Sequence, residues 1–247
     1  DPDLAAFGRE AADGSLELVW DATTKDPSTF AQFMGAVVPS DVLGNYQVNW
    51  IRINVKHPQR TAGEFHCLPR PSYCLKRTLR ALAGCIFPEF AAGVRQLLQQ
   101  VAQDGQFQPT KGGMHAIALL SNCTGGEWVV WIPIDDGDAA WAALGEAFAG
   151  SQLQACTSAK IGYSEHKGMY VIAVTTADYR NLMDVKASYD QLQSVGLLGA
   201  KYESSYRLEC LQYTGMCRTH DGDSRSTTRN GMELNFYRTD NVSTCSQ

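Results

Sequence analysis

The sequence predicts an α+β protein with a mostly antiparallel sheet, helices packed on one face, and stabilising disulfides. Segments with helical spacing and segments rich in β-branched and aromatic residues follow one another along 247 residues, without a Ser/Gly/Pro-rich linker. The stretch 46–160 can be written as a βαββαβ-like core. The cysteine count of eight is even, which permits complete pairing. We expect a single domain over residues 1–247, with a division near 160–168 as the alternative.

The first quarter of the chain predicts two strands and two helical segments. Residues 3–12 have a helical composition and predict a loosely docked N-terminal turn or helix. Residues 16–20 alternate with the period of two that a strand requires. Residues 27–37 have helical spacing, and Pro39 is expected to stop that helix. Residues 46–55 contain no internal Gly or Pro and predict a strand.

The middle of the chain predicts a long helical stretch followed by a hairpin. Residues 72–105 show helical spacing that Pro88 should divide into two helices. Two apolar runs, 114–120 and 127–134, are separated by Asn-Cys-Thr-Gly-Gly. Because glycines favour tight turns between apolar runs, this pattern predicts a β-hairpin.

Aspartates mark the start of the next helix. Asp135, Asp136 and Asp138 precede the alanine-rich segment 139–149. Acidic residues favour a helix N-terminus through capping and the helix dipole, so we interpret them as helix-capping residues.

The last third predicts alternating strands and a helix. After a linker that contains Cys156, residues 169–175 form a buried strand, 179–195 an amphipathic helix and 206–213 another strand. Residues 232–237 are expected to close the sheet.

Cysteines and glycosylation sequons predict a secreted protein. Asn122 and Asn241 both satisfy the N-x-S/T rule, and the chain begins Asp1-Pro2, as a mature secreted form does. The cysteine spacings lack the C-x2-C pattern of a zinc site, so we expect disulfides and no metal. The eight cysteines are Cys67, Cys74, Cys85, Cys123, Cys156, Cys210, Cys217 and Cys245.

Charge and hydropathy exclude two classes of protein. The formal charge is −5, from 26 acidic and 21 basic residues, so binding of nucleic acid through bulk charge is disfavoured. The longest apolar runs fall far short of the roughly 20 residues that cross a bilayer. No transmembrane segment is therefore expected.

Catalytic candidates are limited to histidines and one glutamate. The sequence has no G-x-S-x-G, H-E-x-x-H or Walker-type loop, and no cofactor motif. His115 begins an apolar run after two glycines, and His57, His66 and His166 lie in expected loops, the last beside Glu165. Such residues could supply an acid-base pair, which keeps a secreted hydrolase or nuclease open as an alternative.

Weak candidates for ion binding lie in two places. The aspartates of 135–138 and 221–224 do not complete a calcium loop, and capping or turn formation explains them better. Arg218, Arg225 and Arg229 lie among Ser and Thr in an expected loop that would suit a sulfate, a phosphate or an acidic glycan.

Five tryptophans lie in apolar segments, where core packing is favoured over sugar stacking. They are Trp20, Trp50, Trp128, Trp131 and Trp141.

These patterns favour a binding function over catalysis. The βαββαβ pattern resembles that of small fungal killer toxins and secreted effectors, which implies a module that binds an extracellular protein or glycan. A viral or cell-surface spike domain is a further alternative, because it shares the glycans and cysteines. A hydrolase should bring at least two histidines and a carboxylate to one cleft, whereas a binding module should present an apolar or aromatic patch.

Overall fold

The computed structural model describes residues 4–10, 16–45, 48–55, 118, 124–165 and 167–208. These residues form an α+β fold with a mixed seven-stranded sheet of order β1-β2-β3-β5-β6-β4-β7. The strands are β1 (Gly8–Glu10), β2 (Leu16–Asp21), β3 (Val48–Asn54), β4 (Gly126–Pro133), β5 (Cys156–Ser164), β6 (Met169–Thr176) and β7 (Glu203–Leu208). Strands β2 and β3 are parallel, and the other described neighbours are antiparallel.

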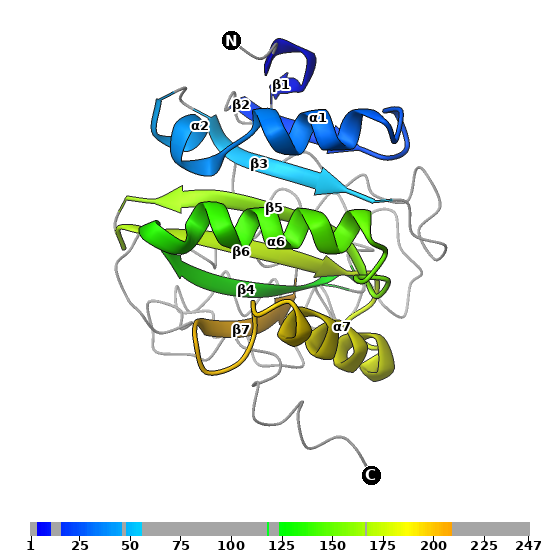
Figure 1. Cartoon of the computed structure of the whole chain (residues 1–247). Helices are drawn as coiled ribbons and strands as arrows, with labels where there is room; N and C mark the ends of the chain where they lie inside the picture. Colours follow the sequence, from blue (N-terminus) through cyan, green and yellow to red (C-terminus); the bar gives the residue numbers. More distant parts are fainter. Residues whose placement is uncertain are drawn as a thin grey trace, which may run out of the picture.

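The described helices lie on the same side of this sheet (Figure 1). They are α1 (Thr29–Ala36), α2 (Pro39–Asn45), α6 (Gly137–Ala149) and α7 (Leu182–Ser194), with short 3-10 turns η1 (Leu4–Ala6) and η2 (Ile134–Asp136). Within the described part of the chain, no helix is long and apolar enough to cross a membrane.

Of the turn or helix expected at the N-terminus, the structure has only a turn, followed by a strand. Only Leu4–Ala6 is helical, as the turn η1, and β1 (Gly8–Glu10) then pairs antiparallel with β2. Phe7 lies between them and packs edge-on against Phe33 of α1. A buried aromatic and a strand partner outweigh the weak helix propensity of a short segment.

Pro39 follows the end of one helix, as expected, and it also begins the next. Helix α1 ends at Ala36, and α2 starts at Pro39. The first turn of a helix tolerates proline because the N–H there has no intrahelical partner. The next N–H, from Ser40, is satisfied by Asp138 of α6, whose Oδ1 accepts at 2.9 Å while Oδ2 accepts from Ser40 Oγ at 2.6 Å. This contact ties the start of α2 to the start of α6.

The expected hairpin between residues 114–120 and 127–134 is wrong. Strand β4 pairs along its whole length with β6 on one side and pairs with β7 on the other. Both of its hydrogen-bonding edges are therefore occupied, and Ala118 is helical. Proximity in sequence favours hairpin partners, but the apolar pattern of a strand does not specify which strand pairs with it.

The segment that contains Cys156 is a strand and not a linker. Residues 156–164 form β5, which pairs with β3 and makes a hairpin with β6 through a turn that contains Gly168 at φ 59°. Cys156 has a free thiol, where the sequence analysis expects a disulfide. Burial raises the pKa of this thiol to about 12, so it is not a nucleophile at neutral pH. The other seven cysteines lie outside the described residues.

The main core lies between the sheet and its helices. Trp128 is fully buried at its centre, and its Nε1 donates to Ser188 Oγ of α7 at 2.9 Å. The rings of Tyr189 and Tyr206 pack against it. The side chains of β4 that point toward the helices are Trp128, Val130 and Ile132. The residues between them must therefore point to the opposite side of the sheet.

Candidate functional site

The side of the sheet that faces away from the helices carries a set of charged side chains. We call it the polar face, and its members are Arg9, Glu17, Arg52, Glu127, Lys160 and Arg207. They alternate along their strands with the core residues described above, because successive side chains of a strand point to opposite faces. Arg52 is paired with Lys160, and Glu127 with Arg207, across neighbouring strands. Six charges from six strands thus share one surface.

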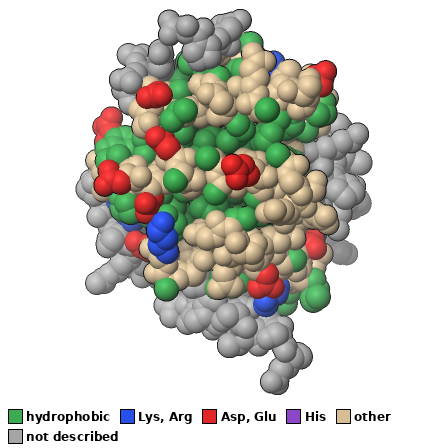
Figure 2. Space-filling view, viewed as in Figure 1, with side chains coloured by type: hydrophobic (Ala, Val, Ile, Leu, Met, Phe, Trp, Pro, Cys, Tyr) green, Lys and Arg blue, Asp and Glu red, His purple; other side chains and the backbone are tan. Residues whose placement is uncertain are grey.

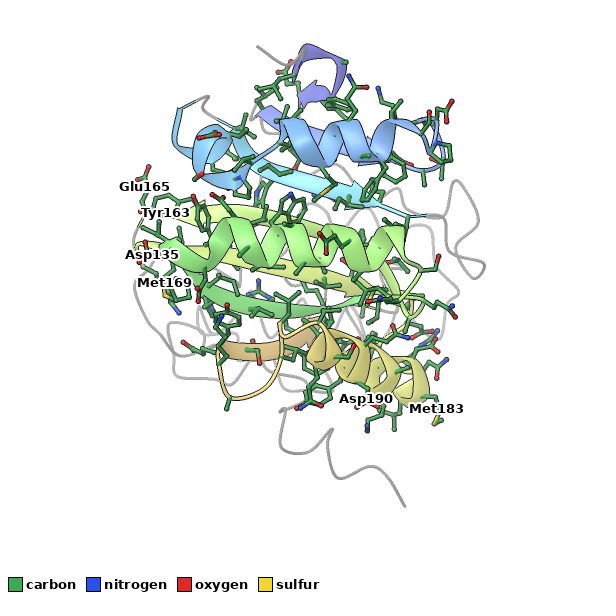
Figure 3. All side chains as sticks on the ribbon, in the orientation of Figure 1. Asp135, Tyr163, Glu165, Met169, Met183 and Asp190 are labelled. Atoms are coloured by element: carbon green, nitrogen blue, oxygen red, sulfur yellow. The ribbon has the colours of Figure 1, made fainter. Side chains whose placement is uncertain are left out.

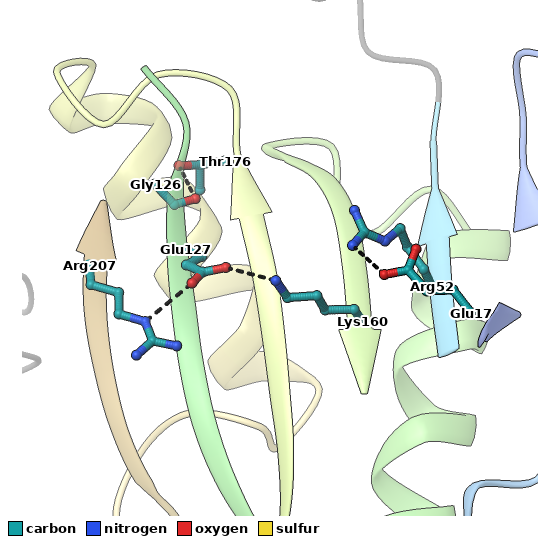
Figure 4. Close-up of polar contacts among 7 residues, drawn as sticks. All are labelled: Glu17, Arg52, Gly126, Glu127, Lys160, Thr176 and Arg207. Carbon is teal, nitrogen blue, oxygen red and sulfur yellow. Dashed lines mark hydrogen bonds and ion pairs between the residues drawn. The ribbon is translucent and has the colours of Figure 1, made fainter. Parts of the chain in front are cut away.

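Glu127 lies at the centre of the best-buried part of the polar face (Figure 4). Its side chain is 1% exposed, and its Oε1 accepts a hydrogen bond from Arg207 Nε at 3.2 Å. Its Oε2 lies 3.6 Å from Lys160 Nζ. The two cations are also mostly buried, with side chains that are 15% and 12% exposed. A buried carboxylate is stable only when such partners surround it.

The electrostatics of this cluster keep Glu127 ionised. Burial raises the pKa of Glu127, but the charges of Lys160, Arg207 and Arg52 and the hydrogen bond from Arg207 together bring it below its usual value. A carboxylate with this pKa is a poor general acid or base at neutral pH. Glu127 therefore anchors the cations of the polar face.

Glu17 anchors the other end of the polar face. Its carboxylate lies 3.4 Å from Arg52 Nη2 and 3.6 Å from Arg9 Nη2. Arg52, with 24% of its side chain exposed, stands between the two buried glutamates. Its Nε is buried and donates to no acceptor in the described part of the chain. This guanidinium thus retains a hydrogen-bond donor that is available to another group.

Two tryptophans border the charged cluster. Trp50 and Trp131 lie on the same face as Glu127 and pack against a small apolar cluster that includes Val129 and Val171. Lys160 Nζ lies 5.0 Å from the centroid of the Trp50 ring. Lys167 Nζ lies 3.8 Å from that of Trp131, within the range of a cation–π contact. Both tryptophans are only partly buried, unlike Trp20, Trp128 and Trp141.

Glycine makes room for one of these rings. The Trp50 ring covers Gly162 of β5, where an added Cβ would lie 2.8 Å from ring carbons. The expectation that tryptophans pack in the core is therefore confirmed for three of the five, while Trp50 and Trp131 occupy the second face.

This arrangement is suited to holding an anion beside an aromatic surface. Arg52, Lys160 and Arg207 supply charged donors, and charge-assisted hydrogen bonds to anions are among the strongest in proteins. The described residues contain no group of three or more His, Cys, Asp or Glu side chains that could hold a metal ion.

Most of the sequence-predicted site residues lie outside the described part of the chain. Glu165 is described, and it lies exposed in the turn between β5 and β6. It forms no part of the polar face. The predicted residues outside the described ranges are His57, His66, His115 and His166, Asn122 and Asn241, and Arg218, Arg225 and Arg229.

The aspartates before α6 do not cap that helix as predicted. The side chain of Asp136, at the N-cap position, makes no hydrogen bond to the first N–H groups of α6. Asp136 instead accepts from Tyr202 Oη at 3.1 Å and pairs with Lys201 at 3.3 Å, and Asp138 binds Ser40 as described above. The two carboxylates thus bind residues that are distant in sequence from α6 and do not bond to the first N–H groups of that helix.

Sequence reasoning missed the polar face altogether. The only signal was a single charged residue within each apolar strand, such as Glu127 between Gly126 and Trp128 or Arg52 between Ile51 and Ile53. Each is typical of a strand with one solvated face, so none indicates a site by itself. Their convergence depends on the strand order and register, which the sequence pattern does not specify.

Comparison with known protein families identifies the family of this chain. A family model described as "Bles03: Basophilic leukemia-expressed protein Bles03" matches residues 21–215, well over half of the chain. The chain therefore belongs to the Bles03 family. No curated protein matches the sequence. The family description states no activity, so the function has to be argued from the site.

Proposed function

We propose that this member of the Bles03 family acts by binding, and that the polar face of its sheet holds an anionic, ring-containing ligand, an acidic glycan. The observation that carries the proposal is the set of three mostly buried cations, Arg52, Lys160 and Arg207, held on one surface beside Trp50 and Trp131. The binding class was already favoured by the absence of a catalytic motif in the sequence. The polar face supplies a specific surface for it.

The charges of this surface favour an anion over a cation. Two buried glutamates, Glu17 and Glu127, face three mostly buried cations, and Arg9 adds a fourth, more exposed one. Buried cations favour counter-charges beside them, and an anionic ligand would share this role with the two glutamates. The Nε donor of Arg52 offers such a counter-charge a hydrogen bond.

The tryptophans favour a ligand with a ring. Aromatic side chains present large, rigid, amphipathic surfaces, and both tryptophans retain exposed area. A sugar ring that carries a carboxylate or sulfate would contact an indole with its C–H face and the cations with its charged group. A simple inorganic anion would use only the second of these contacts.

Isothermal titration with a sulfated heparin oligosaccharide tests the proposal, with a neutral oligosaccharide of equal length as the comparison ligand. Lys160→Met should weaken binding of the sulfated sugar by roughly 10- to 100-fold, because it removes one charge-assisted contact. Trp131→Ala should weaken it as well, and without altering the charge. The matched control is Lys186→Met on α7, which removes a lysine from the helix side of the sheet.

Equal affinity for the charged and neutral sugars would contradict the proposal, and so would equal losses in Lys160→Met and Lys186→Met. Since Lys160→Met also leaves Glu127 with fewer cations, its melting temperature is measured in parallel. If Lys160→Met does not fold, two other measurements still test the proposal. One is the affinity of Trp131→Ala for the sulfated sugar, and the other is the titration of inorganic sulfate against the wild-type protein.

The setting of this function is a second part of the proposal. We infer that the ligand is extracellular, as for a toxin- or effector-like secreted module, from the two sequons and the cysteine count in the sequence. Disulfide stabilisation belongs to the same inference. Expression in a eukaryotic secretory host, followed by mass measurement before and after glycosidase treatment, tests it. An unchanged mass would remove its main support.

A further inference from the structure

A second surface lies at the end of the sheet where β5 turns into β6. Two large apolar side chains are exposed there, Ile134 of η2 at 48% and Tyr163 of β5 at 41%. Tyr163 packs edge-on against Tyr170 of β6, with ring centroids 5.6 Å apart. Figure 3 places Tyr163, Met169, Asp135 and Glu165 together at this end. We call this surface the hairpin patch.

Acidic side chains border the hairpin patch. Asp135 and Glu165 are exposed beside it. Burial raises the pKa of the Tyr170 phenol, and the nearby charges of Asp138 and Asp41 raise it further. Figure 2 shows hydrophobic surface bordered by Asp and Glu side chains at the corresponding edge of the molecule.

Few lysines balance these acids. Apart from Asp41, the described carboxylates at this end are Asp135, Asp136, Asp138, Glu165 and Glu203. The described cations beside them are Lys201, which pairs with Asp136, and Lys167, which pairs with Glu203. These five carboxylates and two lysines leave a surplus of three negative charges among the described residues. The described surface around Ile134 and Tyr163 is thus acidic.

The base of the hairpin patch is rigid. The Tyr170 ring packs directly onto Gly137 at the start of α6, where an added Cβ would collide with the ring. The two hydrogen bonds between Asp138 and Ser40 fix α6 to α2 at the same end. A preformed surface loses little conformational entropy when a partner binds.

We propose that the hairpin patch docks a basic amphipathic protein segment, with an aliphatic or aromatic side chain against Ile134 and Tyr163 and lysines or arginines against the surrounding carboxylates. An apolar centre with a charged rim is typical of protein interaction surfaces. Charge complementarity selects the partner, because a segment of the same sign would be repelled. This surface is separate from the polar face and does not depend on its ligand.

A second copy of this chain fits the hairpin patch poorly. Two copies meeting through this patch would bring two surpluses of three negative charges together. An anionic lipid surface is disfavoured for the same reason. The acidic rim therefore points to a basic partner.

Fluorescence anisotropy with three labelled peptides tests the proposal on the full chain. The first alternates Leu and Lys, the second replaces each Lys with Glu, and the third replaces each Leu with Ser. The Leu/Lys peptide should bind the wild-type protein, and more weakly as salt is added. Ile134→Ser should weaken this binding about tenfold, because it removes a buried aliphatic contact. Asp135→Asn should weaken it several-fold and reduce its salt dependence.

The control variant is Met183→Ser, which removes another exposed apolar side chain, 78% exposed at the start of α7. It should leave the affinity unchanged. All three substituted positions are solvent-exposed, so the fold is expected to persist, and circular dichroism verifies it. Equal binding of the Leu/Lys and Ser/Lys peptides would overturn the proposal, as would unchanged binding to Ile134→Ser. So would a dimer in sedimentation that Ile134→Ser dissociates.

Discussion

Replacing Glu127 by glutamine should destabilise the protein strongly although the two side chains have nearly the same shape. The carboxylate is 1% exposed and is the shared counter-charge of Arg207 and Lys160. Glutamine can still accept the hydrogen bond from Arg207 Nε, but both cations lose their compensating charge. Removing one partner of a buried ion pair costs about 3–5 kcal/mol, and the retained hydrogen bond places the expected loss near the lower figure, at about 3 kcal/mol.

Urea titration followed by tryptophan fluorescence measures this loss. For a chain of this size, about 3 kcal/mol corresponds to a melting temperature lower by roughly 6–12 °C. The matched control is Asp190→Asn in the exposed Lys186–Asp190 pair of α7, where the same chemical change should cost about 0.5 kcal/mol or less. A loss below about 1 kcal/mol in Glu127→Gln, or a loss no larger than that of the control, would refute the reasoning.

The pH dependence gives a second test. Because the folded-state pKa of Glu127 is lowered, its contribution to stability is fully present above the usual pKa of a glutamate, about 4.3. The contribution is lost as the pH falls through the lower, folded-state pKa. The stability difference between wild type and Glu127→Gln should therefore be largest near neutral pH and shrink below about pH 4.3. A constant difference over that range would mean that the charge of Glu127 contributes nothing.

Two further predictions concern the core. Gly126→Ala should cost about 1–3 kcal/mol of unfolding free energy in urea titration, because the added Cβ would collide with Tyr206 and displace its 2.6 Å hydrogen bond with Thr176. The control is Gly35→Ala in α1, where nothing lies within 4 Å of the added Cβ, and it should be neutral or stabilising. Equal effects of the two substitutions would contradict this prediction. Cys156 should resist alkylation in the native protein and react once it is unfolded without reductant, as counted by mass spectrometry; a Cys156 peptide found in a disulfide would contradict the free thiol.

The sequence by itself determined the class of the fold and most of its elements. The strand expected at 46–55 is β3 (Val48–Asn54), and the helix expected at 179–195 is α7 (Leu182–Ser194). The strand expected at 169–175 is β6 (Met169–Thr176). These segments have clear periodicity, and periodicity is a local property that the side chains of one segment carry.

Only the tertiary structure decided which strands pair and where the charges meet. Strand β4 carries apolar side chains on both faces, with Glu127 as its one charged residue. It would suit either a hairpin with its predecessor or the central position that it takes between β6 and β7. The sequence of segment 156–164 shows no clear strand pattern, and the segment forms a strand because it pairs with β3 on one side and β6 on the other. Glu127, Lys160 and Arg207 come from three such strands. Their contact follows from strand order and register, which depend on packing between segments that are distant in sequence, and therefore no local pattern in the sequence records it.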